Sequence, residues 1–114
     1  MKVIFANVAQ GFVYTDDPDK AGGILFKKFS IPDYVVYFKR KNPDILCLSE
    51  ALINDEEGNS EFVDTIAKAT GLNHVKVFRS EKSWMYIGKH YGLAILSHDL
   101  ISKRHFPNYL NREI

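Results

Sequence analysis

The chain has 114 residues, 46% of them hydrophobic, so it is long enough for one small domain with a buried core and is not a disordered tail. Fifteen Lys and Arg residues against fourteen Asp and Glu residues give a net charge of +1, which excludes a strong long-range attraction to nucleic acid or to an anionic membrane. No apolar stretch reaches the length of a membrane span, and Asn7 and Gln10 interrupt the first apolar run too early for a signal peptide. The single Cys47 lies in an apolar run and behaves as a small hydrophobic residue, which predicts a reducing, cytoplasmic compartment.

The first predicted element is a strand from Val3 to Val8. This apolar, partly β-branched run is too short for a helix and predicts a central strand buried on both faces, with Asn7 as its first polar interior residue. From Ala9 to Ser30 the pattern predicts a long loop that contains Asp16, Asp17 and Asp19. Loops of this length often border a functional site.

A helix is predicted next. Ser30 and Asp33 have the spacing of a capping box, and Pro32 is tolerated in a first turn. Its apolar face comprises Ile31, Tyr34, Val35 and Phe38. The basic run 39–41 ends it, where the helix dipole favours cations, so we interpret this run as a solvated helix end rather than a phosphate site.

A second strand follows and ends, by this reading, at Glu50. The segment "DILCLSE" contains a run of apolar residues and closes on Ser49 and Glu50, after which "NDEEGN" predicts a polar turn. A second helix is predicted with Asn59 or Ser60 as its N-terminal cap and Gly71 as its stop. Its apolar face comprises Phe62, Val63, Ile66 and Ala67.

The remaining sequence predicts further strands. Val75 and Val77 alternate with polar residues as a half-exposed strand, "MYI" and "YGLAILS" form a strand pair across Gly88, and "LISKRHF" is again strand-like. Strands that alternate with two helices predict a mixed α/β class, and no linker divides residues 1–114, so we expect one domain.

Asn7 and Glu50 are the candidate site residues. Each closes an apolar strand, and α/β sheets bind ligands beyond the ends of their strands, so both residues are predicted at one sheet edge. An amide oxygen and a carboxylate suit Mg²⁺ or Mn²⁺, with waters and a substrate phosphate completing the shell. The alternative is that Glu50 is an exposed strand terminus with no function.

Three sequence blocks resemble a known family. The segments "KVIFANV", "PDILCLSEA" and "YGLAILSHDLI" match, in order, the first blocks of the endonuclease/exonuclease/phosphatase superfamily, a four-layered α/β sandwich of Mg²⁺-dependent phosphoesterases. The resemblance implies that residues 1–114 are the amino-terminal half of such a domain, with a mixed, mainly antiparallel sheet and two helices on one face. It implies that Glu50 binds the catalytic metal, and that Asn7 binds phosphate or orients a metal-bound water.

Some of the family's catalytic motifs are absent from this sequence. The Asp-x-Asn pair and the late catalytic His of the family have no match here, so the substrate, a nucleic acid or a small phosphate compound, would be hydrolysed only in a complete protein. Two apolar-rich strands with helices on one side leave a face for that second half or for self-association. A zinc cluster at His98 and His105 and a stacking surface at residues 84–86 are less favoured readings. The competing hypothesis is a non-catalytic α/β interaction module.

Overall fold

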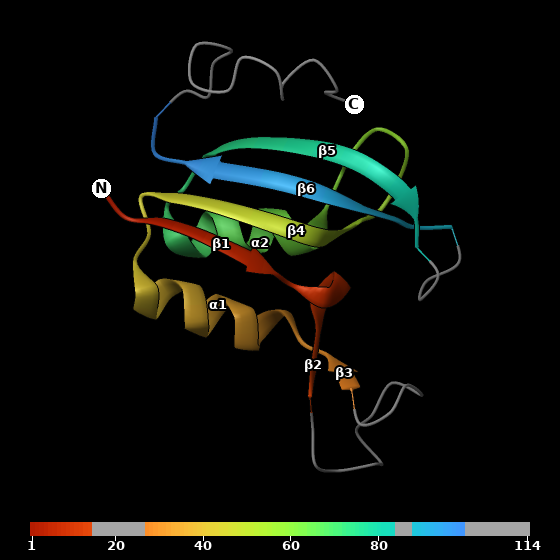
Figure 1. The fold of residues 1–114 in the computed structure, drawn as a ribbon, viewed down its shortest axis with the longest axis horizontal. Helices are drawn as coiled ribbons and strands as arrows, with labels where there is room; N and C mark the ends of the chain where they lie inside the picture. The colour runs from red at the N-terminus through yellow and green to blue at the C-terminus, as the bar shows by residue number, and fades with distance from the viewer. Residues whose placement is uncertain (15–26, 84–87, 100–114) are drawn as a thin grey trace.

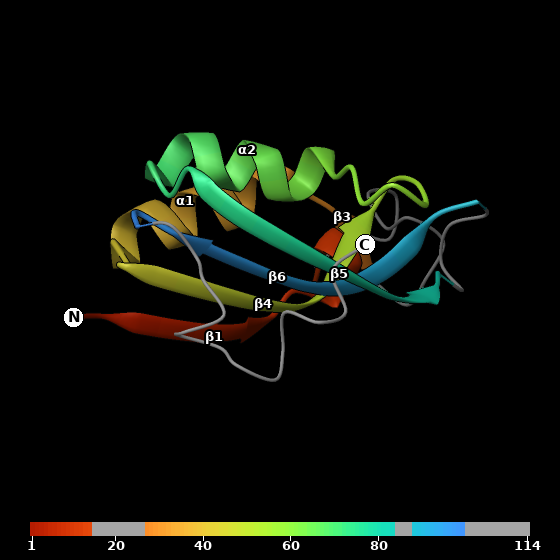
Figure 2. The same cartoon turned by 90° about the horizontal axis from the view of Figure 1, so that it is seen from above.

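The computed structural model describes residues 1–14, 27–83 and 88–99, and these form a four-stranded sheet with two helices on one face (Figures 1 and 2). The strand order is β1-β4-β6-β5, which is Val3–Asn7, Ile45–Ile53, His90–Ser97 and His74–Lys82. β1 pairs with β4 in parallel, and the other two pairings are antiparallel. The predicted class, a mixed and mainly antiparallel α/β unit, is confirmed.

Both helices begin and end where the sequence predicts. Helix α1 spans Ile31–Lys41, and the hydroxyl of Ser30 accepts a hydrogen bond from the Asp33 amide at 3.4 Å. Helix α2 spans Glu61–Thr70 and is capped by Ser60, whose hydroxyl accepts from the Val63 amide at 3.0 Å. Gly71 ends α2 in the left-handed conformation, which glycine adopts without strain.

One core lies between the helices and the sheet. Its largest fully buried side chains include Phe38 of α1, Phe62 and Ile66 of α2, and Leu46 and Leu48 of β4. These are the residues that the helical and strand periodicities predict. The helices therefore cover one face of the sheet.

The prediction that the first strand is central and buried on both faces is wrong. Among the described strands β1 lies at the edge of the sheet, and β4 and β6 are central. Ile4 and Ala6 pack against the core, whereas Val3 is 44% exposed and Phe5 is 80% exposed. Apolar composition alone does not distinguish a central strand from an edge strand whose outer face awaits a partner.

The described residues at the two ends of the predicted loop 9–30 form regular structure. A short 3₁₀ turn, Ala9–Gly11, leads into β2 (Phe12–Tyr14), which pairs antiparallel with β3 (Lys27–Phe29). Strands of three residues are too short for sequence alternation to reveal. The three Asp residues at 16, 17 and 19, the predicted "MYI" strand and the predicted "LISKRHF" strand lie outside the described residues.

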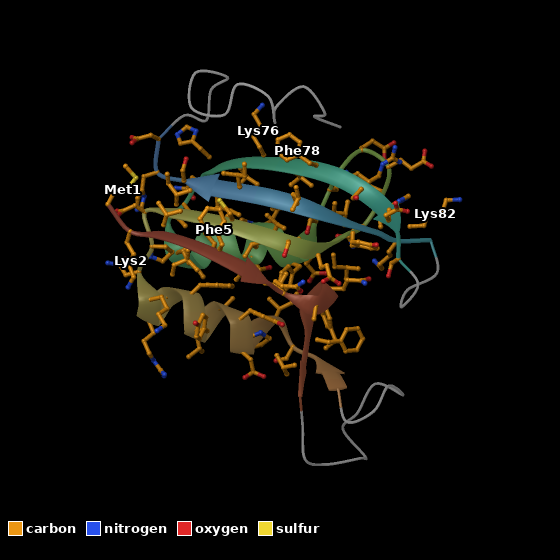
Figure 3. The ribbon with its side chains drawn as sticks, in the orientation of Figure 1. Met1, Lys2, Phe5, Lys76, Phe78 and Lys82 are labelled. Atoms are coloured by element: carbon orange, nitrogen blue, oxygen red, sulfur yellow. The ribbon has the colours of Figure 1, made fainter. Side chains whose placement is uncertain are left out.

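The second face of the sheet is apolar and carries no described helix. Phe5 on β1 and Phe78 on β5 stand on this face (Figure 3), together with Cys47, Leu93 and Ile95. A cavity of about 350 Å³ is lined there by Phe5, Cys47, Leu93 and Ile95 among others. Partial burial raises the pKa of the Cys47 thiol, consistent with a hydrophobic rather than a reactive role. Neither helix in the described part of the chain has the length and apolarity to cross a membrane.

Candidate metal and phosphate site

Asn7 and Glu50, 43 residues apart in sequence, meet at one end of the β1–β4 pair. The parallel register places Asn7 beside Ser49, one residue before Glu50. The side-chain amide of Asn7 donates a hydrogen bond to Oε2 of Glu50. The structure therefore brings the two candidate residues together, as expected of two parallel strands whose polar residues share an edge.

Glu50 is not at the end of its strand, and on this point the sequence prediction is wrong. Strand β4 continues to Ile53, and its register with β6 shifts between Leu48 and Ala51. Glu50 itself has a φ of 52°, in the left-handed region that residues other than glycine rarely adopt. This irregularity is a β-bulge, which bends the strand and redirects a side chain without ending the ladder. In the sequence a polar residue inside an apolar run resembles a strand terminus, although the apolar "ALI" that follows Glu50 indicates a continuing strand.

Asn7 is held by its own backbone surroundings. Its side-chain oxygen accepts a hydrogen bond from the Ala9 amide at 2.9 Å, so the amide nitrogen is directed at Glu50. The Ala9 amide, the Asn7 side chain and the Glu50 carboxylate thus form a chain of two hydrogen bonds. In this arrangement Asn7 orients the carboxylate, which is the role that outer partners play around metal ligands.

The turn after β1 contains a residue that the sequence did not single out for the site. Ala9 and Gln10 both have positive φ values, 46° and 56°, followed by Gly11 at 93°. Gln10 is fully buried, its side-chain oxygen accepts from the Ser83 hydroxyl, and its side-chain nitrogen has no hydrogen-bond partner among the described residues. Strained backbone and an unsatisfied buried donor concentrate at functional sites, and here both stand directly after Asn7. In the sequence, the feature that could have indicated a role for Gln10 is its large polar side chain between the small residues Ala9 and Gly11.

One carboxylate fits the needs of Mg²⁺ only in part. Mg²⁺ is usually held by one or two carboxylates, with waters and substrate phosphate completing the octahedron, and Glu50 can provide one of these ligands. Within the described ranges no three His, Cys, Asp or Glu side chains cluster in a way that would hold a metal. His98 is exposed, and its proposed zinc partner His105 lies outside the described residues. The residues present therefore fit a partial Mg²⁺ site at Glu50.

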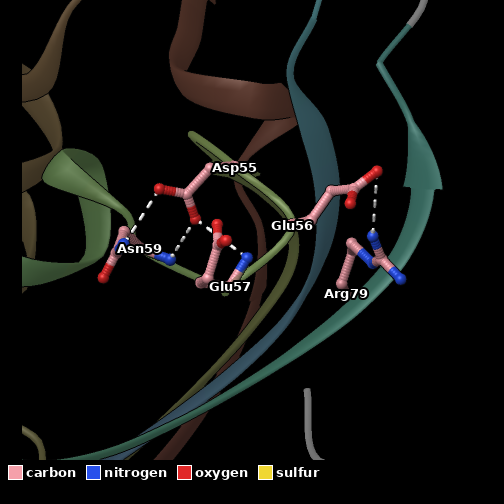
Figure 4. Close-up of polar contacts among 5 residues, drawn as sticks. All are labelled: Asp55, Glu56, Glu57, Asn59 and Arg79. Carbon is pink, nitrogen blue, oxygen red and sulfur yellow. Dashed lines mark hydrogen bonds and ion pairs between the residues drawn. The ribbon is translucent and has the colours of Figure 1, made fainter.

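The acidic turn after β4 has a structural role (Figure 4). Asp55 accepts hydrogen bonds from the backbone amides of Glu57 and Asn59 at 3.1 Å and from the Asn59 side chain at 2.9 Å. The Asn59 side chain, followed by its backbone amide, lowers the pKa of Asp55. Glu56 lies 4.0 Å from the Arg79 guanidinium. Asp55 thus holds the turn that leads into α2.

Comparison with known proteins supports the fold. No protein-family model matches the sequence, and no curated protein matches it. A solved structure does match: the crystal structure of an endonuclease/exonuclease/phosphatase from Beutenbergia cavernae DSM 12333, with a TM-score of 0.60 and 17% sequence identity. The fold of this chain is therefore similar to part of the fold of that protein. The match covers 85% of this chain and 25% of that chain.

Proposed function

We propose that this chain is the metal-binding, amino-terminal part of a Mg²⁺- or Mn²⁺-dependent phosphoesterase, a nuclease, phosphodiesterase or phosphatase. The observation that carries the proposal is the contact between Asn7 and Glu50, set on a β-bulge in a sheet of endonuclease/exonuclease/phosphatase fold. The substrate class is a phosphoester in a nucleic acid or in a small phosphate compound.

Glu50, Asn7 and the Ala9 amide have different roles in the proposed site. Glu50 is the metal ligand, because its carboxylate contacts Asn7 at this end of the β1–β4 pair. Asn7 fixes the orientation of that carboxylate, and the Ala9 amide fixes Asn7. When bound, a divalent ion at such a site neutralises phosphate charge during in-line displacement.

In this proposal the general acid and base of the reaction come from outside the 114-residue chain. General acid–base catalysis typically contributes about 10²–10⁴-fold, and the Asp-x-Asn pair and late His of the family have no match in this sequence. The proposal therefore needs further polypeptide that supplies those groups and covers the apolar face with its 350 Å³ cavity. We expect no appreciable turnover by the 114-residue chain alone.

The second candidate function is a non-catalytic interaction module. It is favoured by one observation, the exposure of Phe5 and Val3 on a sheet face that no described element covers. In this alternative the Asn7–Glu50 contact only supports the bulge.

Titration with paramagnetic Mn²⁺ distinguishes the metal-dependent phosphoesterase from the interaction module. Titration of the ¹⁵N-labelled chain should broaden the resonances of Asn7, Glu50 and their neighbours first, and the Glu50→Gln variant should lose this broadening. Glu61→Gln, a matched change at an exposed position on α2, should leave it intact. Broadening confined to Asp55, Glu56 and Glu57 would contradict the metal assignment.

Hydrolysis of bis-p-nitrophenyl phosphate tests the reaction itself. The assay compares the 114-residue chain, any longer product of the same gene, and Glu50→Gln in both. We expect activity only in the longer product and its loss in the variant. Activity that survives Glu50→Gln would refute the role of this carboxylate, and inactivity of a longer product that binds Mn²⁺ at Glu50 would favour the interaction module.

A further inference from the structure

The two edges of the sheet that the described strands form differ in how they are protected. Strand β5, at one edge, carries charged side chains and a register shift between Arg79 and Glu81. Its charged residues are Lys76, Arg79, Glu81 and Lys82. Charges and bulges are the usual means by which proteins prevent an edge strand from pairing with another chain. Strand β1, at the other edge, has the sequence VIFAN, with no charge, no proline and no bulge.

The backbone of β1 has hydrogen-bonding groups that point away from the sheet. Its flanking residues bond toward β4: the Lys2 carbonyl accepts from the Ile45 amide at 3.2 Å, and the Val8 amide donates to the Ser49 carbonyl at 3.0 Å. Because these directions alternate along a strand, the amides and carbonyls of Val3, Phe5 and Asn7 point outward. A strand added along this edge could form backbone hydrogen bonds with all three of these residues.

Hollows flank this edge on both sides. The cavity of about 350 Å³ on the open face includes Phe5, Ala6 and Asn7 in its lining. A second cavity of about 490 Å³ lies on the helix side between Ala6, Asn7, Val13 and α1, where Tyr37 is half exposed. A strand beside β1 would place alternate side chains into the two hollows, so it must be apolar on both faces, as β1 itself is.

Charge along the edge selects the direction of pairing. At the start of β1, Lys2 donates to the Lys41 carbonyl at the basic end of α1, and the Asp44 carboxylate accepts a hydrogen bond from the Lys2 backbone amide. Four basic side chains, Lys2, Lys39, Arg40 and Lys41, against this one carboxylate leave the end positively charged. At the finish of β1, Glu50 contacts Asn7, and Asp33 lines the same cavity as Asn7. Antiparallel pairing of two identical edges places the basic end of each copy against the acidic end of the other, whereas parallel pairing opposes like charges.

We propose that β1 is the dimerisation edge of this chain, and that it pairs antiparallel with β1 of a second copy about a twofold axis near Phe5. The pairing joins two sheets into one and leaves the charged β5 strands at both outer edges. The proposed edge includes Asn7 and lies beside Glu50 of the candidate metal site, but its test measures association and needs neither metal binding nor activity.

Light scattering after size exclusion tests the proposal on the 114-residue chain. We expect a species of twice the 13.1 kDa chain mass that dissociates on dilution. Phe5→Lys places two like charges at the axis and should weaken the dimer by about tenfold or more. Phe5 is 80% exposed, so the fold should persist, and circular dichroism checks this. Val3→Lys is the second variant if Phe5→Lys unfolds. Val36→Lys, the same kind of change at a 55% exposed position on α1, should leave the dimer unchanged.

Amide hydrogen exchange distinguishes edge pairing from stacking of the apolar faces. In the dimer the outward amides of Val3, Phe5 and Asn7 should exchange slowly, and in Phe5→Lys they should exchange about tenfold faster or more. The inward amides of Ile4 and Ala6 should be protected in both proteins. A monomer at millimolar concentration, a dimer with fast outward amides, or a dimer weakened equally by Val36→Lys would each overturn the proposal. Protection of these amides only in a longer, monomeric product would show that another segment occupies the edge and would overturn it as well.

Discussion

Replacing Asn7 by Ala tests the link between the turn after β1 and the carboxylate of Glu50. The substitution removes the donor to Oε2 of Glu50 and the acceptor of the Ala9 amide, so the carboxylate loses its orientation while its charge stays. Loss of an outer partner typically weakens metal binding by about 10–100-fold. Because Asn7 is exposed, the lower end applies, and we expect the Kd for Mn²⁺ to rise about tenfold, or about 1.4 kcal/mol.

The measurement is a Mn²⁺ titration followed by water-proton relaxation, with Glu50→Gln as the variant that removes the ligand. Asn73→Ala, the same change at an exposed position before β5, is the matched control and should leave the Kd unchanged. The free energy of unfolding of Asn7→Ala should fall by about 1–2 kcal/mol, since two exposed hydrogen bonds are lost. A Kd for Asn7→Ala within twofold of the parent value would refute the positioning role.

Three predictions concern the scaffold of the site. Ser60→Ala removes the α2 cap and the hydrogen bond that the hydroxyl donates to the Leu52 carbonyl, so urea unfolding should show a loss of about 1–3 kcal/mol, whereas exposed Ser80→Ala should show little change. Gly92→Ala should be more disruptive than a surface glycine change, because the new methyl group would lie 2.0 Å from the Phe78 carbonyl oxygen; thermal unfolding should show loss of the cooperative transition or a drop of about 4 kcal/mol or more. The pKa of Asp55 is lowered on folding, so its stabilising contribution is present above about pH 4 and is lost as the pH falls through the lowered value. Unfolding curves of Asp55→Asn should accordingly depend less on pH in the acid range than those of the parent chain. An equal acid dependence in both proteins would contradict the role assigned to the turn.

The sequence by itself determined the local elements and the pairing of site residues. Ser30, Ser60 and Gly71 mark helix ends through hydrogen bonds and backbone conformations that involve only neighbouring residues, so their signals are complete in the sequence. The sequence predicts that Asn7 and Glu50 share an edge, because each is a polar residue that follows an apolar run. Contact between them follows once those strands pair in parallel.

Only the tertiary structure decided where each strand lies and how Glu50 is presented. The place of β1 at the edge depends on which strands pair with β4, and pairing partners distant in sequence leave no local signal. The bulge at Glu50 arises from a register shift against β6, some forty residues away, so a polar residue inside β4 imitates a strand end in sequence. The burial of Gln10 depends in the same way on a distant residue, Ser83, which directly follows β5. Local hydrogen bonds are specified by adjacent side chains, whereas register and burial are set by distant segments packing together.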